Sequence, residues 1–158
     1  MTTLIDELDA ARADLLASFA GLDETALDRK GLVGEWSVKN VLAHIVGWEV
    51  WVIEMLQTRL AGGDLPDHLR AAAADEHAFN AAQVAEREEL TPDEQLMELE
   101  RTRDELLALL RGLDPARLDD PRPWPSARSS VADYLRASLI HHDQEHAAYL
   151  RAALDESH

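Results

Sequence analysis

Residues 36–49, WSVKNVLAHIVGWE, contain the strongest helix start in the chain and decide how the rest is interpreted. Ser37 is placed to cap the free amides of a first turn, and Trp36 before it is placed to pack on Val41 as a hydrophobic staple. Helix-forming residues continue to Leu60, and Gly62-Gly63 offers a stop. The stretch therefore predicts a helix from about residue 38 to 60.

Three other segments repeat their apolar residues at intervals of three and four. One covers residues 3–20. A second starts at Thr91, with Pro92 at the first helical position and Glu94 three residues past the cap, and stops at Gly112. The last starts at Ser129 or Ser130 and runs to about Leu154. The sequence thus predicts four main helices.

The connections between these helices differ in length and composition. Residues 22–35 suggest a loop with one short helical turn, and residues 64–89 a long connection that contains helix. Residues 113–130 carry four prolines, which predict an irregular loop. No window alternates at period two, so no sheet is expected. We predict an all-α fold, an up-down four-helix bundle with long second and third connections, formed by one domain over residues 1–158.

The charge balance is strongly acidic. Asp and Glu outnumber Lys and Arg by 31 to 15, which gives a net charge of −16. Such a surface repels phosphate backbones, so we expect no nucleic-acid partner. There is no cysteine, so a metal site would have to use histidine and carboxylate ligands. The first residues, MTTLIDELDAARADLL, lack a signal-peptide pattern, and no run is long enough to span a membrane, so we expect a cytoplasmic protein with no membrane partner.

Histidines concentrate in residues 140–146, IHHDQEH, which hold three of the seven in the chain. At about 100° per residue, His142 and His146 fall on the apolar stripe of the last helix, whereas His141 points away from it. The other stripe positions are Val131, Leu135, Leu139, Tyr149 and Ala153.

A third histidine, His44, lies at the border of the apolar face of the 38–60 helix. If the two helices are neighbours, His44, His142 and His146 supply three nitrogens, and a three-His set with an open position is typical of catalytic zinc and related sites. The alternative is three unrelated buried imidazoles, and the residue pattern leaves both open. Nearby, Trp48 and Trp51 are core residues or walls of a pocket.

Other polar residues near these positions have simpler explanations. Glu49 lies about 140° from His44 on the helix, too far round to share a metal with it. Asp143 and Glu145 flank the histidine pair and are either chance neighbours or groups that orient an imidazole. His68, His77 and His158 fall in loop-like or terminal sequence, where we expect them to be solvated.

The two His-bearing stretches, WSVKNVLAHIVGWE and HHDQEHAAYLR, resemble the second and fourth helices of the DinB-like superfamily. Within it they resemble the branch of DfsB and colibactin self-resistance proteins, and residues 79–113 between them, FNAAQVAEREELTPDEQLMELERTRDELLALLRGL, follow the same pattern. The resemblance covers about residues 36–152. It implies a four-helix bundle in which one histidine of the second helix and two of the fourth hold a divalent metal, and the matching positions are His44, His142 and His146.

Members of this superfamily include transferases and isomerases that use bacillithiol, mycothiol or glutathione, and a hydrolase-like self-resistance branch. The mycothiol-dependent maleylpyruvate isomerases carry Glu at the position of His142, and bacillithiol-transferase-like members tend to carry Gln at that of Tyr149. The sequence departs from both groups at these positions.

The resemblance and the histidines together predict a metal-dependent enzyme of thiol-transferase or hydrolase type acting on a small electrophile. Zinc or nickel is the expected metal, a thiol such as mycothiol a candidate cosubstrate, and Trp48 and Tyr149 the expected ligand contacts; no catalytic residue is assigned. By resemblance alone we expect a homodimer. One alternative is a non-enzymatic, small-molecule-binding or stress-response bundle with an apolar pocket lined by Trp48, Trp51 and Trp124. Another is an interaction protein that dimerises through one face.

Overall fold

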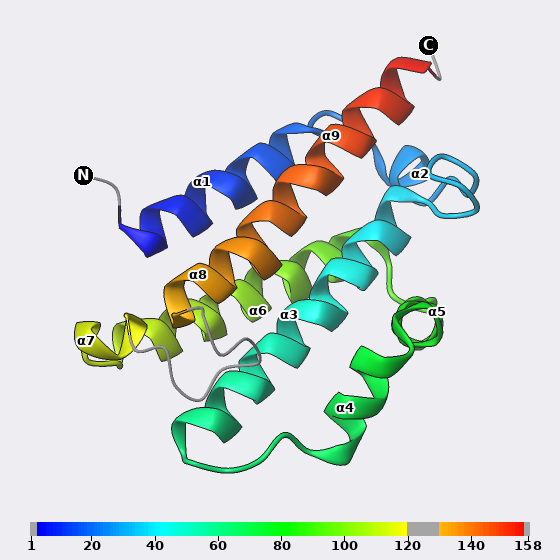
Figure 1. Cartoon of the computed structure of the whole chain (residues 1–158). Coiled ribbons are helices and arrows are strands. Elements are labelled where there is room, and N and C mark those ends of the chain that lie inside the picture. Colours follow the sequence, from blue (N-terminus) through cyan, green and yellow to red (C-terminus); the bar gives the residue numbers. More distant parts are fainter. Residues whose placement is uncertain (1–2, 120–129, 157–158) are drawn as a thin grey trace.

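Four long helical segments form a bundle in the computed structural model of the chain, which describes residues 3–119 and 130–156 (Figure 1). Three of them are α1 (Leu4–Ala17), α3 (Val38–Leu60) and α6 (Pro92–Arg111). The fourth is continuous through α8 (Val131–Leu135), a π-helical turn η1 (Arg136–Ile140) and α9 (His141–Glu156). No strand occurs in the described ranges. The predicted all-α four-helix bundle is confirmed.

Side-chain caps fix where α3 and α6 begin. The Ser37 hydroxyl accepts a hydrogen bond from the Asn40 amide, and the Asn40 side chain accepts one from the Ser37 amide, each at 3.0 Å. Thr91 and Glu94 form the same reciprocal pair at the start of α6. Each pair satisfies two backbone donors that a helix start leaves free. Both helices therefore begin at the residues that the sequence predicted.

The first two connections contain helix, as the sequence predicted, and the third contains helix that was not predicted. The first holds the single turn α2 (Glu24–Leu27), and the second holds α4 (Asp67–Ala74) and α5 (Glu76–Glu86), which are separated at Asp75. The third includes α7 (Pro115–Leu118), so an entirely irregular loop was wrong. Proline is compatible with the first helical position, and Asp114 caps this turn. Trp124 and the other three prolines lie outside the described residues.

The helices do not alternate strictly in direction. Lys39, at the start of α3, donates 2.9 Å hydrogen bonds to the carbonyls of Glu88 and Leu90, just before α6. Met55, late in α3, belongs to the same buried cluster as Leu110, late in α6. The two helices thus run parallel (Figure 1). A simple up-down order was wrong because the long second connection, α4 and α5, returns the chain to the end where α3 began.

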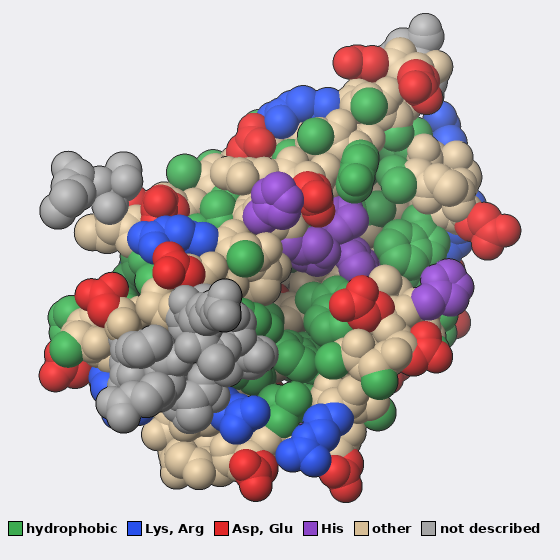
Figure 2. Space-filling model, in the orientation of Figure 1, with side chains coloured by type: hydrophobic (Ala, Val, Ile, Leu, Met, Phe, Trp, Pro, Cys, Tyr) green, Lys and Arg blue, Asp and Glu red, His purple; other side chains and the backbone are tan. Residues whose placement is uncertain are grey.

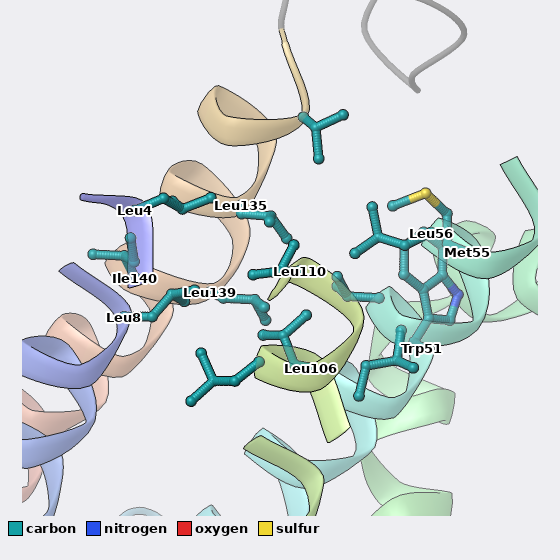
Figure 3. Close-up of a cluster of buried hydrophobic side chains, with 14 of the residues drawn as sticks. Leu4, Leu8, Trp51, Met55, Leu56, Leu106, Leu110, Leu135, Leu139 and Ile140 are labelled. Carbon is teal, nitrogen blue, oxygen red and sulfur yellow. The ribbon is translucent and has the colours of Figure 1, made fainter. Parts of the chain in front are cut away.

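Two hydrophobic clusters fill the bundle, one toward each end. In the first, Leu106 and Leu110 of α6 lie between Leu135 and Leu139 on one side and Trp51 of α3 on the other (Figure 3). In every bundle helix a charged residue sits between the segments that supply the two clusters. These four buried residues, which we call the core tetrad, are Arg12, Glu49, Arg103 and Asp143.

Ion pairs connect the core tetrad into a closed ring. Arg12 bonds to Glu49 at 2.7 Å and to Asp143 at 3.0 Å. Arg103 bonds to the same two carboxylates. The third guanidinium nitrogen of each arginine donates to a backbone carbonyl, Arg12 to that of Leu99 and Arg103 to that of Leu8. Each bundle helix contributes one member, so the ring joins all four helices at one level.

None of the helices in the described ranges combines the length and hydrophobicity needed to cross a membrane.

Candidate metal centre

Three histidines from two helices converge beside the core tetrad. His44 of α3 and His142 and His146 of α9 place their Nε2 atoms 3.0, 3.1 and 3.0 Å apart, nearly an equilateral triangle. His44 is buried and the two on α9 are half-buried. Figure 2 shows histidine side chains gathered at the edge of a hollow that has a hydrophobic floor. Within the described residues this is the group of three that could hold a metal ion.

The π-helical turn η1 sets the orientation of the α9 histidines. A π turn adds one residue to a helix, which rotates everything after it by about 100° relative to a regular helix. Leu135 just before the turn and Leu139 within it face the core; after the turn, Asp143, Ala147 and Leu150 do. His142 and His146 are thereby turned off the core stripe toward α3. The expected core positions of these histidines and of Tyr149 assumed a regular helix and were wrong for this reason.

Asn80 of α5 fixes which nitrogen of His44 is free. Its Oδ1 lies 2.6 Å from Trp48 Nε1 and 2.9 Å from His44 Nδ1. The indole N–H can only donate, so the shared atom must be the amide oxygen, which can only accept. His44 Nδ1 must therefore carry the proton. Its Nε2 is left with a free lone pair directed at the other two histidines.

Close packing of α5 on α3 allows this contact. A Cβ on Gly47 would lie 2.4 Å from the Gln83 side chain, nearer than atoms can approach, so glycine is required for the observed spacing. Gln83 is three residues after Asn80 and Gly47 three after His44. The small residue in the middle of α3 thus brings Asn80 within reach of the His44 ring.

Burial keeps these imidazoles neutral. It lowers the pKa of His142 to about 4, helped by the nearby His44 and Arg12. Burial also lowers the pKa of His146 to about 3, with His142 and His44 adding to the shift, and it lowers the pKa of His44. At neutral pH each of these neutral rings has one nitrogen lone pair that a cation can use. Neutral imidazole is also the form that binds metal.

The nitrogen spacing suits a single ion. Ligand nitrogens about 2.0–2.1 Å from a zinc-like ion lie roughly 2.9–3.4 Å apart for angles between octahedral and tetrahedral. The observed separations of 3.0–3.1 Å fall in that range. One feature is unusual: in the described structure, His146 Nδ1 is buried without a hydrogen-bond partner, whereas ligand histidines normally donate from that nitrogen. The donor set fits a divalent metal, with an imperfect outer shell at His146.

A cavity of about 420 Å³ opens beside this centre. His44 and His142 are among its lining residues, which come from α3, α4, α5 and the continuous segment α8–η1–α9. The residues that complete the lining are Trp48, Trp51, Val52, Ala73, Glu76, Asn80, Tyr134 and Ser138. A cavity of this size, bordered by possible ligands of a metal, has room for a small organic molecule.

The remaining sequence candidates fall in different places. Trp48 lines the cavity, but Tyr149 does not: it is 56% exposed, and its ring lies 6.0 Å from that of His146. Glu49 and Asp143 belong to the core tetrad and so have a structural explanation. Trp36, assigned to the helix start, also has its ring centre 5.4 Å from that of His44.

Several polar candidates lie at the surface, away from the three histidines. His141 pairs with Glu145 at 3.1 Å, and His68 with Glu54 at 2.7 Å. His77 is exposed, as expected. His158 is outside the described residues.

Sequence reasoning missed Asn80, Tyr134, Ser138 and Glu76. Two signals pointed to the first. Asparagine is a poor helix former, and here it stands inside a helical, alanine-rich segment. A glycine inside a helix, as at Gly47, often marks close approach of another backbone. Tyr134 and Ser138 gave no comparable signal.

Comparisons with known proteins agree with this architecture. The family model described as the DinB superfamily matches residues 7–150. Among solved structures, an uncharacterised protein from Escherichia coli UTI89 shares 15% identity with a TM-score of 0.83, covering 98% of this chain and 92% of its own. A search of the curated proteins found no significant match.

Two further structures belong to named proteins. The colibactin self-resistance protein ClbS, in complex with a dsDNA, shares 14% identity with a TM-score of 0.82, covering 96% of this chain and 93% of its own. DfsB, a sibling lethal factor precursor, shares 16% identity with a TM-score of 0.78, covering 98% and 94%. At these identities the likeness establishes the shared fold.

The complex of ClbS with dsDNA corrects one expectation. Net charge was taken to exclude a nucleic-acid partner, and a protein of this fold is solved with DNA. The exclusion was wrong because the net charge of −16 is a sum over the whole chain. Contacts to phosphate depend on a few basic or polar groups at one place on the surface.

Proposed function

Since this chain belongs to the DinB superfamily, we propose that it is a divalent-metal-dependent enzyme of thiol-transferase or hydrolase type that acts on a small electrophilic molecule. The observation that carries the proposal is the convergence of three Nε2 atoms within 3.1 Å of one another at the wall of a cavity of about 420 Å³. His44, His142 and His146 hold the metal. Zinc or nickel is the ion expected from the all-nitrogen donor set.

A divalent ion at this place supplies Lewis acidity, which lowers the pKa of a thiol or water or polarises an electrophile. The residues of the chain do the rest. Asn80 holds the His44 ring in the tautomer that leaves Nε2 free. Trp48 and Trp51 form the apolar wall that excludes water from a bound molecule. Tyr134 lines the cavity, and burial raises the pKa of its hydroxyl to about 12, so this group stays protonated well above neutral pH.

Elemental analysis of protein prepared without a histidine tag is the first test. We expect about one divalent ion per chain in the wild type and loss of that ion in His44→Ala and His142→Ala. The matched controls are His68→Ala and His77→Ala, which remove exposed histidines outside the cavity and should retain the ion. A wild type that binds no metal even after addition of zinc or nickel would reject the enzyme proposal and leave the non-enzymatic, small-molecule-binding bundle as the better explanation.

Activity is then tested on metal-loaded protein with mycothiol, bacillithiol or glutathione and a panel of small electrophiles. Turnover that requires one thiol and disappears in His142→Ala identifies a transferase. Turnover that needs no thiol identifies a hydrolase. Because ClbS is solved with a dsDNA, a DNA duplex belongs in the binding panel. Binding of DNA with no turnover of any electrophile would contradict the small-molecule assignment.

A further inference from the structure

The charges that line the cavity beside the histidines limit the kinds of ligand that it can bind. Among the described residues of its lining, Glu76 is the one carboxylate, and there is no lysine or arginine. Glu76 is the first residue of α5 and precedes Asn80 by one helical turn, so both side chains lie on the same face of that helix. Apart from the metal centre, the charge at the cavity wall is therefore negative.

The two tryptophans offer a ligand no hydrogen-bond donor, because each indole N–H is already bonded within the protein. Trp48 Nε1 donates to Asn80 at 2.6 Å, and Trp51 Nε1 donates to the carbonyl of Leu69 at 3.0 Å. Neither indole has an N–H left for a ligand. What they offer in the cavity is aromatic surface, whose faces carry the negative end of the ring quadrupole. Tryptophan is the side chain that attracts organic cations most strongly in this way.

Contacts with neighbouring rings hold these indoles in place. The ring centres of Trp48 and Trp51 are 5.8 Å apart, and Trp48 lies 4.5 Å from Phe79 of α5. The hydrogen bonds and ring contacts together leave the indoles little freedom to rotate, so the aromatic wall exists before any ligand arrives.

We propose that this cavity selects a small organic cation: a molecule with an ammonium or amidinium group on an apolar body, held against Trp48, Trp51 and Glu76. The inference rests on the proposed function in one respect, since the reactive end of such a molecule would point to His44 and His142. It makes the electrophile of the proposed reaction a cationic one. The binding preference itself can be measured on protein with or without metal.

Three probes of similar size test the preference. They are (4-hydroxyphenyl)trimethylammonium, its uncharged isostere 4-tert-butylphenol, and the anion 4-hydroxybenzoate. Binding to chelator-treated protein is followed by tryptophan fluorescence and calorimetry. We expect the cation to bind at least about tenfold more tightly than the isostere, the gain typical of a desolvated cation on tryptophan. No binding of the cation at millimolar concentration, or equal affinity for the anion, would overturn the proposal.

Substitution of Glu76 then tests whether the preference for a cation arises from this carboxylate. Glu76→Gln removes the charge and keeps the shape, and it should weaken binding of the cation about three- to tenfold while leaving that of 4-tert-butylphenol unchanged. Asp67→Asn is the matched control, since Asp67 is likewise the exposed first residue of a short helix, α4, and does not line the cavity. A cation preference unchanged in Glu76→Gln would reject the role of this carboxylate.

The two proposals can fail separately. A protein that holds no metal but prefers the cationic probe keeps this inference and loses the proposed enzyme. A protein that binds metal through its histidines but prefers 4-hydroxybenzoate in the chelated form keeps the metal centre and loses the cation selectivity. The metal content of each sample is measured alongside the probe binding.

Discussion

At the scale of single residues, Asn80 contributes to two parts of the site, although it is 36 residues from His44 in the sequence. It accepts hydrogen bonds from both His44 and Trp48, so one amide oxygen orients a proposed ligand and a cavity wall together. Partners of ligand histidines typically contribute 10- to 100-fold to metal affinity. We expect Asn80→Ala to weaken metal binding within about that range, as measured by competition with a chelating dye.

Two further variants test whether Asn80 acts by orienting the His44 ring or only by filling space. Asn80→Asp keeps an oxygen that accepts from His44 Nδ1 and should restore most of the metal affinity lost in Asn80→Ala. His77→Ala removes an exposed side chain of the same helix that does not line the cavity and should leave the affinity within about twofold of wild type. Equal affinities in Asn80→Ala and wild type would mean that the hydrogen bond does not position His44.

The lowered histidine pKa values give metal-free protein a defined pH response. The unfolded chain takes up protons on these imidazoles below about pH 6.5, whereas folded His142 and His146 resist protonation down to about pH 4 and 3. The unfolded state then binds more protons, so stability is present above pH 6.5 and falls as the pH drops toward 4. Urea unfolding of chelated protein should show a loss of about 2 kcal/mol or more between pH 7 and 5.

The double variant His142→Gln/His146→Gln is the control for this response. It removes both titrating groups, so its free energy of unfolding should change less between the same two pH values. A pH dependence as steep as that of wild type would place the source in other groups, such as the many surface carboxylates.

At the scale of helices, the sequence predicted the elements whose ends are set locally. Ser37 and Thr91 begin their helices through contacts within four residues, and such caps are visible in sequence. The break at Asp75, the single turn α7 and the π turn were not predicted. A π turn leaves no residue signature in RASLI, because it is an insertion that becomes visible only when the core on either side is known.

The π turn yields a prediction about deletions. If one residue is removed from it, Leu135, Leu139, Asp143 and Ala147 fall at the three- and four-residue spacing of a regular helix. We therefore expect deletion of the exposed Ala137 to convert the segment to α-helix with a small effect on stability and retained metal binding. Circular dichroism, thermal melting and metal titration of the variant check this.

Deletion of Gln144 provides the contrast. Gln144 is also exposed, but it lies between His142 and His146 in regular helix, and its loss changes their spacing from four residues to three. It also turns Ala147 and Leu150 out of the core by about 100°. This variant should lose both metal binding and stability. Comparable damage from the two deletions would show that the π turn is required for the fold itself.

At the scale of the whole molecule, the tertiary arrangement was the least predictable part. The helical periodicity of the separate segments pointed to the three histidines because it placed each on or near an apolar face, and the structure brings them together. It did not reveal that α3 and α6 are parallel, or that Arg12, Glu49, Arg103 and Asp143 pair in the interior. In a chain with 31 acidic and 15 basic residues, nothing local distinguishes the four that form the core tetrad. Those pairings involve residues from four different helices.

The core tetrad predicts a large response to single substitutions. Arg103→Met leaves two buried carboxylates with one guanidinium, and an uncompensated buried charge typically costs about 3–5 kcal/mol. Arg151→Met removes an exposed partner of Asp14 and should cost less than about 1 kcal/mol. Urea unfolding followed by fluorescence and circular dichroism measures both. Coincident transitions in the wild type would also support the expectation that residues 1–158 form one domain.

Replacing all four residues of the core tetrad tests whether the bundle needs these ion pairs or only a well-filled interior without unpaired charge. With Arg12→Met, Glu49→Met, Arg103→Met and Asp143→Leu combined, no charge is left unpaired, and apolar replacements of buried ion networks are often neutral or stabilising. We expect this variant to be more stable than Arg103→Met alone, as measured by urea unfolding. If the ion pairs also fix the register of α9, the metal affinity of the quadruple variant should fall, because His142 is next to Asp143 in the chain. Stability at or below that of Arg103→Met would instead mean that the ion pairs stabilise the bundle by more than an apolar core of similar volume.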